Sequence, residues 1–165
     1  MSGNRVHLAS FPRSGNSFLR KILEQITGIY TGSDFHMRDA LPLQHSGLLG
    51  EQVYGGNSVW VTKSHYPLLQ MGHAQMEVDK VICIVRNPTD VLPSYANLFA
   101  TVSHTQTLQQ EWSEIKCWPK FVKALIKDWN EYHNRLRAQA QKTPTFFLTY
   151  EQMMVDPIPV MVKLF

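Results

Sequence analysis

Short apolar runs alternate along the chain with segments in which apolar residues recur at helical spacing. Four runs are rich in β-branched or aromatic residues, which favour strands, and they cover residues 6–11, 59–62, 81–85 and 145–149. Other segments repeat apolar residues every three or four positions, which predicts helices; they cover residues 18–28, 119–141 and 150–155, and a further one begins at residue 87. Because strands that alternate with helices pair in parallel, the pattern predicts an α/β fold, a three-layer, doubly wound parallel sheet flanked by helices.

The ends of the predicted helices carry recognisable signals. Residues 87–90 (Asn-Pro-Thr-Asp) supply a favoured N-cap, a favoured first residue and a carboxylate that complements the helix dipole. Residues 156–157 (Asp-Pro) are expected to break the last short helix. Residues 28–57 are rich in Gly, Ser, Asp and His, so we expect irregular structure there.

Composition and charge narrow the class of protein. The 165 residues are enough for one domain with a hydrophobic core, and 44% hydrophobic with 18% charged residues is a globular composition. The formal net charge is +3 and the sequence pI is about 8.9, a bias too weak to indicate nucleic-acid binding. A small polyanionic ligand would suit this mild positive charge.

The cysteines and the apolar runs bear on the cellular compartment. Two cysteines are too few for a disulfide scaffold, and Cys83 lies within an apolar run, where we expect a buried free thiol. No apolar stretch approaches the roughly 20 residues that a membrane helix needs, and the first residues show no signal-peptide pattern. We therefore expect a cytoplasmic protein without a membrane segment.

Residues 12–17 form a turn-rich loop between the first predicted strand and the first predicted helix. Unpaired N–H groups and the helix dipole make a helix N-terminus an anion-binding site, above all after a tight glycine-containing loop. Small and polar residues lie at this mouth: Ser14, Gly15, Asn16 and Ser17. Arg13 adds a positive charge with several donors. The loop alone is equally compatible with a plain strand-to-helix turn, and it lacks the Walker A lysine, which argues against ATP or GTP hydrolysis.

Three stretches resemble motifs of the sulfotransferases that use 3′-phosphoadenosine-5′-phosphosulfate (PAPS), and they occur in the family's order. Residues 11–18 (Phe-Pro-Arg-Ser-Gly-Asn-Ser-Phe) resemble the 5′-phosphosulfate-binding loop. Residues 63–67 (Lys-Ser-His-Tyr-Pro) resemble the segment that carries the catalytic base, and residues 85–95 resemble the 3′-phosphate motif. The resemblance spans about residues 5–157. It implies PAPS as the cosubstrate and transfer of a sulfuryl group to an acceptor hydroxyl or amine.

The resemblance also implies roles around the transferred group. Arg13 and the backbone of residues 14–17 would hold the 5′-phosphate. The family often has lysine in place of Arg13, and since arginine keeps its proton, Arg13 would stabilise charge without acting as an acid. Lys63 would then contribute more to protonating or stabilising the leaving phosphate. His65 would be the general base that accepts the acceptor's proton, the alternative being a surface histidine in a turn.

A second group of residues would contact the rest of the nucleotide. Arg86 follows a predicted strand and Ser94 lies eight positions later, so both could reach the 3′-phosphate, although Arg86 could also form a surface ion pair. Pro93 removes a helical hydrogen bond, and the kink expected there would displace Ser94. Phe18 would stack on adenine or else belong to the core of the first helix. Tyr150 would approach the nucleotide.

Several hypotheses stay open at this point. An active PAPS-dependent sulfotransferase leads; a catalytically silent sulfotransferase-like binding or structural subunit is the second, and a nucleotide kinase the third. The chain is expected to be a single domain, residues 1–165, lacking the family's usual C-terminal part, and a second chain or an oligomer is possible. The acceptor is not readable from the sequence. The other histidines show no spacing typical of a metal site, and we expect no metal; they are His7, His36, His45, His73, His104 and His133.

Overall fold

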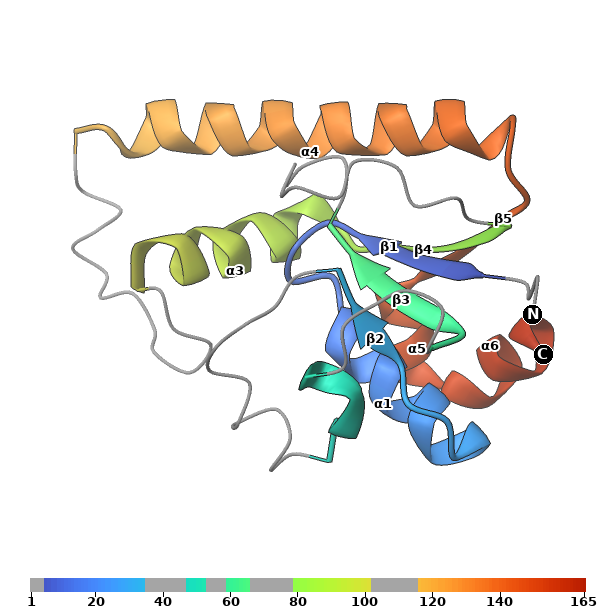
Figure 1. Cartoon of the computed structure of the whole chain (residues 1–165). Coiled ribbons are helices and arrows are strands. Elements are labelled where there is room, and N and C mark those ends of the chain that lie inside the picture. The colour runs from blue at the N-terminus through green and yellow to red at the C-terminus, as the bar shows by residue number, and fades with distance from the viewer. Residues whose placement is uncertain (1–4, 35–46, 53–58, 66–78, 102–115) are drawn as a thin grey trace.

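The computed structural model of the chain describes residues 5–34, 47–52, 59–65, 79–101 and 116–165 and shows a parallel sheet flanked by helices (Figure 1). The sheet has five strands in the order β2-β3-β1-β4-β5, and every pair of neighbours is parallel. The strands are β1 (Val6–Ser10), β2 (Gly32–Ser33), β3 (Val61–Ser64), β4 (Lys80–Val85) and β5 (Thr145–Thr149). The helices are α1 (Asn16–Thr27), the 3₁₀ helix η1 (Leu49–Gln52), α3 (Pro88–Thr101), α4 (Trp118–Ala140), α5 (Tyr150–Val155) and α6 (Pro157–Leu164).

Helices cover both faces of the sheet, with α3 and α4 on one face and α1, α5 and α6 on the other (Figure 1). Alternate residues of each strand point to opposite faces. In β1, Leu8 therefore joins a core cluster with residues of α1, α5 and α6, whereas Ala9 joins a second cluster with residues of α3 and α4. The three-layer, doubly wound parallel sheet expected from the sequence is confirmed.

Strand β4 is buried on both faces, as its uninterrupted apolar run predicts. Ile82 and Ile84 pack in the cluster below the sheet, and Val81 and Cys83 pack in the cluster above it. Burial raises the pKa of the Cys83 thiol to about 12, so this cysteine behaves as a small apolar side chain. The expected buried free thiol is confirmed.

The observed elements differ from the predicted ones at three places. The strand predicted at 59–62 lies at Val61–Ser64, so Lys63 belongs to the strand and not to the loop after it. Residues 28–57, expected to be irregular, contain β2 and η1. The break predicted at 156–157 does end α5, but it also starts α6: the Asp156 side chain accepts a hydrogen bond from the N–H of Ile158, and Pro157 is the first helical residue.

Two buried charged side chains of α1 hold β2 and η1 in place. Arg20 donates to Thr31 Oγ1 at 2.7 Å and to the Gly50 carbonyl at 3.0 Å. Glu24 accepts from both the N–H and the hydroxyl of Thr31 and from the N–H groups of Leu49 and Gly50. A Cβ on Gly50 would overlap Thr31 and the Glu24 carboxylate, so glycine is required there by close approach. We call this network the α1 clamp.

Candidate functional site

The loop between β1 and α1 has the backbone of an anion cradle. Gly15 is the N-cap of α1 and has left-handed angles, φ 91° and ψ 19°, which glycine adopts without strain. No side chain caps the first turn of α1, so its N–H groups face the mouth of the loop. The loop is closed by hydrogen bonds from the Ser14 N–H to the Phe11 carbonyl, 3.2 Å, and from the Leu19 N–H to the Gly15 carbonyl, 3.0 Å.

Two buried polar atoms in this loop have no hydrogen-bond partner among the residues that the structure describes. Ser14 Oγ and Asn16 Oδ1 are both buried without a hydrogen bond, although Asn16 Nδ2 donates to Ser10 Oγ at 3.0 Å. Buried polar atoms are normally paired. The Ser14 hydroxyl can donate to an anion bound in the cradle, whereas Asn16 Oδ1 only accepts and so cannot pair with a phosphate oxygen. The sequence-predicted Ser14, Gly15, Asn16 and Ser17 thus lie together at the start of α1.

Arg13 lies where the loop meets α3. Its φ of 68° is in the left-handed region, which residues other than glycine seldom adopt. Its side-chain Nε donates to Ser94 Oγ at 3.0 Å. Pro93 lies inside α3 immediately before Ser94. We expected this proline to displace Ser94, but Ser94 still lies within hydrogen-bond distance of Arg13 in the loop.

Arg86 joins the same group from the end of β4. Its Nη1 donates to the carbonyl oxygen of Arg13 at 2.7 Å, and its guanidinium carbon lies 4.3 Å from the centre of the Tyr150 ring, a cation–π contact. The Nε of Arg86 is buried and has no hydrogen-bond partner in the described part of the chain. Arg86 is therefore held in place from two sides while one of its donors remains unused, an arrangement unlike a surface ion pair.

The first residues of α5 pack against the loop. A Cβ on Gly15 would overlap the ring of Tyr150, so Tyr150 lies directly against the loop backbone. The next residue, Glu151, accepts a hydrogen bond from the N–H of Asn87 at 2.9 Å. A capping box at Thr149 fixes the start of α5. The start of α5 thus contacts both the loop at residues 11–18 and the motif at residues 85–95.

His65 lies at the end of β3, beside β1. Its Nδ1 is 2.7 Å from the carbonyl oxygen of Ser10. Because a carbonyl only accepts, Nδ1 carries the proton and Nε2 has the lone pair. Burial, followed by the positive charge of Lys63, lowers the pKa of His65 to about 3, against a smaller opposing effect of the Ser10 hydrogen bond. His65 is thus a neutral imidazole with a defined acceptor atom.

Lys63 and Phe18 differ in burial. Lys63 is buried within β3, between Leu8 of β1 and Ser33 of β2 in the strand register. Phe18 is 37% exposed on α1, so the alternative that it belongs to the core is wrong and its ring is accessible beside the loop. Residues 66–67, which complete the Lys-x-His-x-Pro match, lie outside the described residues.

Sequence reasoning missed the α1 clamp and the role of Ser10. Arg20 and Glu24 are four residues apart on α1, and both flank the apolar positions Leu19 and Leu23. That position at the edge of the buried stripe is the signal that could have identified them. Ser10 accepts a hydrogen bond from Asn16 on its hydroxyl and lies at hydrogen-bond distance from His65 through its carbonyl, so it joins the loop to the histidine.

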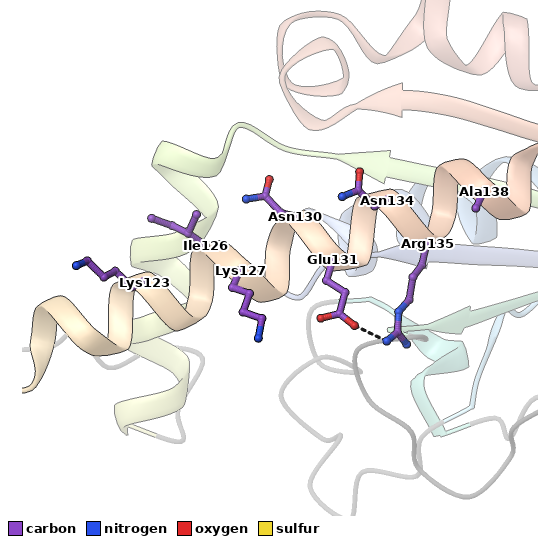
Figure 2. Close-up of a pocket in the computed structure, with 8 residues that line it drawn as sticks. All are labelled: Lys123, Ile126, Lys127, Asn130, Glu131, Asn134, Arg135 and Ala138. Atoms are coloured by element: carbon purple, nitrogen blue, oxygen red, sulfur yellow. Dashed lines mark hydrogen bonds and ion pairs between the residues drawn. The ribbon is translucent and has the colours of Figure 1, made fainter.

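A separate groove runs along the exposed side of α4 and has a volume of about 690 Å³. Figure 2 shows the α4 side chains that line it, among them Lys123, Lys127 and the ion pair of Glu131 with Arg135. None of the sequence-predicted site residues lines this groove. The candidate site is therefore the cluster at the carboxyl ends of β1, β3 and β4, where parallel α/β sheets place their ligands.

The described residues contain neither a cluster of metal-binding side chains nor a membrane-spanning helix. Among residues 5–34, 47–52, 59–65, 79–101 and 116–165, no group of three or more His, Cys, Asp or Glu side chains could hold a metal ion. Within those same ranges, no helix is both long enough and apolar enough to cross a bilayer.

The chain is similar in sequence to several known proteins. WSCD family member CG9164 of Drosophila melanogaster is 32% identical over 125 residues, which cover 74% of this chain and 37% of that protein. The flavonol 3-sulfotransferase of Flaveria bidentis is 27% identical over 173 residues, 98% of this chain and 55% of the relative. The chain thus spans between about a third and just over half of the length of these curated relatives.

Two solved structures share the fold. Retinol dehydratase in complex with androsterone and the inactive cofactor PAP has a TM-score of 0.60 and 16% identity, covering 97% of this chain and 58% of that chain. The mouse sulfotransferase SULT7A1 complexed with PAP has a TM-score of 0.51 and 19% identity, covering 98% of this chain and 56% of that chain. The family model of the sulfotransferase domain matches residues 4–165. The chain therefore belongs to the sulfotransferase domain family.

Proposed function

We propose that the chain carries the nucleotide site and the catalytic base of a sulfotransferase that transfers a sulfuryl group from PAPS to an acceptor hydroxyl or amine. One observation carries the proposal: Arg86 and Ser94, from the motif for the 3′-phosphate, both hydrogen-bond Arg13 of the loop for the 5′-phosphate. Two phosphate subsites that share a residue fit a nucleotide phosphorylated at both positions. The PAP in the two related structures supports this choice of ligand.

The nucleotide would be held by three groups of residues. The backbone N–H groups and hydroxyls of residues 14–17 face the 5′-phosphate, with Arg13 beside them. Arg86 Nε, the buried donor without a partner, and the Ser94 hydroxyl bind the 3′-phosphate. Phe18 offers its accessible ring to adenine. Tyr150 acts on the nucleotide through Arg86, since its ring lies against both Gly15 and that guanidinium.

The transfer step then follows from the chemistry of the side chains. His65 Nε2 takes the proton of the acceptor while the acceptor atom forms a bond to sulfur. The bond between sulfur and the bridging oxygen breaks, and its electron pair stays on the 5′-phosphate, which leaves as 3′,5′-bisphosphoadenosine (PAP). Arg13 and Lys63 stabilise the charge that develops on that phosphate.

The low pKa of His65 is compatible with this role. The imidazole is neutral at any pH near 7, so it is ready to accept a proton. The bound cosubstrate places several negative charges near His65, and such charges raise the pKa of a histidine. In the proposed complex His65 is therefore a stronger base than its pKa of about 3 alone would make it.

Arg13 favours a second candidate, a sulfotransferase-like subunit that binds the nucleotide without turning it over. An arginine at this position cannot donate a proton to the leaving oxygen. The nucleotide kinase has no such support, because no lysine follows Gly15 as a Walker A motif requires.

Calorimetric titration of the purified chain with PAP tests the proposal, with ATP as the competing ligand. We expect PAP to bind with a clear preference over ATP, and Arg86→Ala to weaken PAP binding about tenfold or more, since a charge-assisted pair to the 3′-phosphate is lost. A folded chain that binds neither ligand, or prefers ATP, would contradict the proposal. Release of PAP from PAPS over a panel of phenol, alcohol and amine acceptors, with His65→Ala as control, then separates the active enzyme from the silent subunit.

A further inference from the structure

One hydrogen bond links the residues proposed for the two phosphate subsites. Arg86 Nη1 donates to the Arg13 carbonyl oxygen at 2.7 Å, a short bond from a charged donor. Arg13 is the loop residue with a positive φ, 68°. Side chains rarely tolerate that conformation, so it persists only where surrounding contacts hold it. The Arg86 bond is such a contact.

Arg13 is also held from its other end. Its Nε donates to Ser94 Oγ at 3.0 Å. Both residues expected to bind the 3′-phosphate, Arg86 and Ser94, therefore contact Arg13, one at the backbone and one at the side chain. The Tyr150 ring restricts this arrangement further, because it contacts both the Gly15 backbone and the Arg86 guanidinium.

Both contacts leave donors for a ligand. Arg86 Nε is buried without a partner among the described residues, so it can donate to a phosphate while Nη1 stays on the Arg13 carbonyl. Ser94 accepts from Arg13 through a lone pair, and a hydroxyl that accepts one hydrogen bond can also donate one to a phosphate. A phosphate at the 3′ subsite would thus fix the two side chains in the positions that hold Arg13.

We propose that Arg86 is a positioning residue for the 5′-phosphate loop as well as a ligand of the 3′-phosphate, so that the two subsites are energetically coupled through Arg13. This inference rests on the proposed nucleotide site. It assigns Arg86 a role in binding a nucleotide that has no 3′-phosphate at all, which a pure 3′-phosphate ligand would not have. By linkage, occupation of either subsite strengthens binding at the other.

The test is a double-mutant cycle with adenosine 5′-phosphate, which lacks the 3′-phosphate. Its four proteins are the wild type, Arg86→Met, Arg13→Gly and the double variant, and binding is followed by amide chemical shifts. Glycine adopts a positive φ without strain, so the Arg13→Gly loop does not need Arg86 to hold it. We expect Arg86→Met to weaken adenosine 5′-phosphate binding about fivefold more when Arg13 is present than when Gly replaces it, within the usual range of coupling.

The cycle separates charge from positioning. If Arg86 acts only through its charge, Arg86→Met weakens adenosine 5′-phosphate binding by the same factor with Arg13 and with glycine in its place. An equal loss of affinity in the two proteins, or no loss in either, would therefore overturn the coupling. Arg86→Lys repeats the cycle with the charge kept, in case the methionine variant does not fold. PAP binding by the wild type is measured alongside: if PAP does not bind, the proposed function fails, whereas PAP binding with an additive cycle rejects only the coupling.

Discussion

At the scale of single residues, His65 has a fixed tautomer and a lowered pKa. Its Nδ1 is tied to a main-chain carbonyl, which leaves Nε2 as the acceptor atom, and its surroundings hold its pKa near 3. The sequence indicated His65 through its Lys-x-His-x-Pro context. It could not indicate the tautomer, because the partner is the backbone of Ser10, 55 residues earlier in the chain.

The lowered pKa of His65 predicts how stability changes with pH. In the unfolded chain the imidazole binds a proton below its ordinary pKa of 6.5, whereas the folded chain resists protonation down to about 3. Between these values the unfolded state holds more protons, so the folded state loses stability as pH falls. His7 and His133 have lowered pKa values for the same reason, burial, and contribute in the same direction.

His65→Gln isolates the contribution of this one residue. We expect the free energy of unfolding, measured in urea, to fall less steeply for the variant than for the wild type as pH is lowered from about 6.5 towards 4. The difference in slope is at most about 1.4 kcal/mol per pH unit. Parallel curves for the two proteins would mean that His65 titrates normally in the folded chain.

At the scale of elements, the hydrophobic pattern predicted the strands and helices that have a clear apolar run or amphipathic repeat in their own sequence. Strands β1, β4 and β5 and helices α4 and α5 are continuous apolar runs or amphipathic repeats, and each lies within a few residues of its predicted position. Strand β3 was displaced because Lys63 and Ser64, two polar residues, are buried inside it. Strand β2 and η1 have no pattern of their own, since they are held by contacts from α1.

The α1 clamp predicts that the same change, Glu to Gln, lowers the free energy of unfolding far more at residue 24 than at residue 131. Glu24→Gln leaves an amide that cannot accept every bond from the buried N–H groups of Thr31, Leu49 and Gly50, which strands at least one buried donor. We expect a loss of about 2 kcal/mol or more in the free energy of unfolding. Glu131→Gln is the matched control: it removes an exposed ion pair with Arg135 and should cost less than about 1 kcal/mol.

Chemical denaturation of both variants checks this prediction. Equal and small losses would show that the clamp contributes little, and that β2 and η1 are held mainly by the pairing of Gly32 and Ser33 with β3.

At the scale of the whole molecule, the strand order explains how distant motifs form one site. Strand β1 lies between β3 and β4, so the loop after β1 is flanked by the ends of both neighbours. His65 follows β3 and Arg86 follows β4, and each lies within hydrogen-bond distance of a backbone carbonyl at the end of β1 or in its loop. The motifs in the sequence named the candidate residues, whereas the contacts of His65 with Ser10 and of Arg86 with Arg13 depend on the order of the strands.

The central claim is that these residues form one nucleotide site, and an NMR titration with PAP tests it most directly. The account predicts that saturating PAP shifts the amide signals of residues 14–17, Arg86 and Ser94 together with the imidazole signals of His65. The α4 groove lined by Lys123 and Lys127 should remain unchanged. Shifts confined to that groove, or none in a folded chain, would contradict the account.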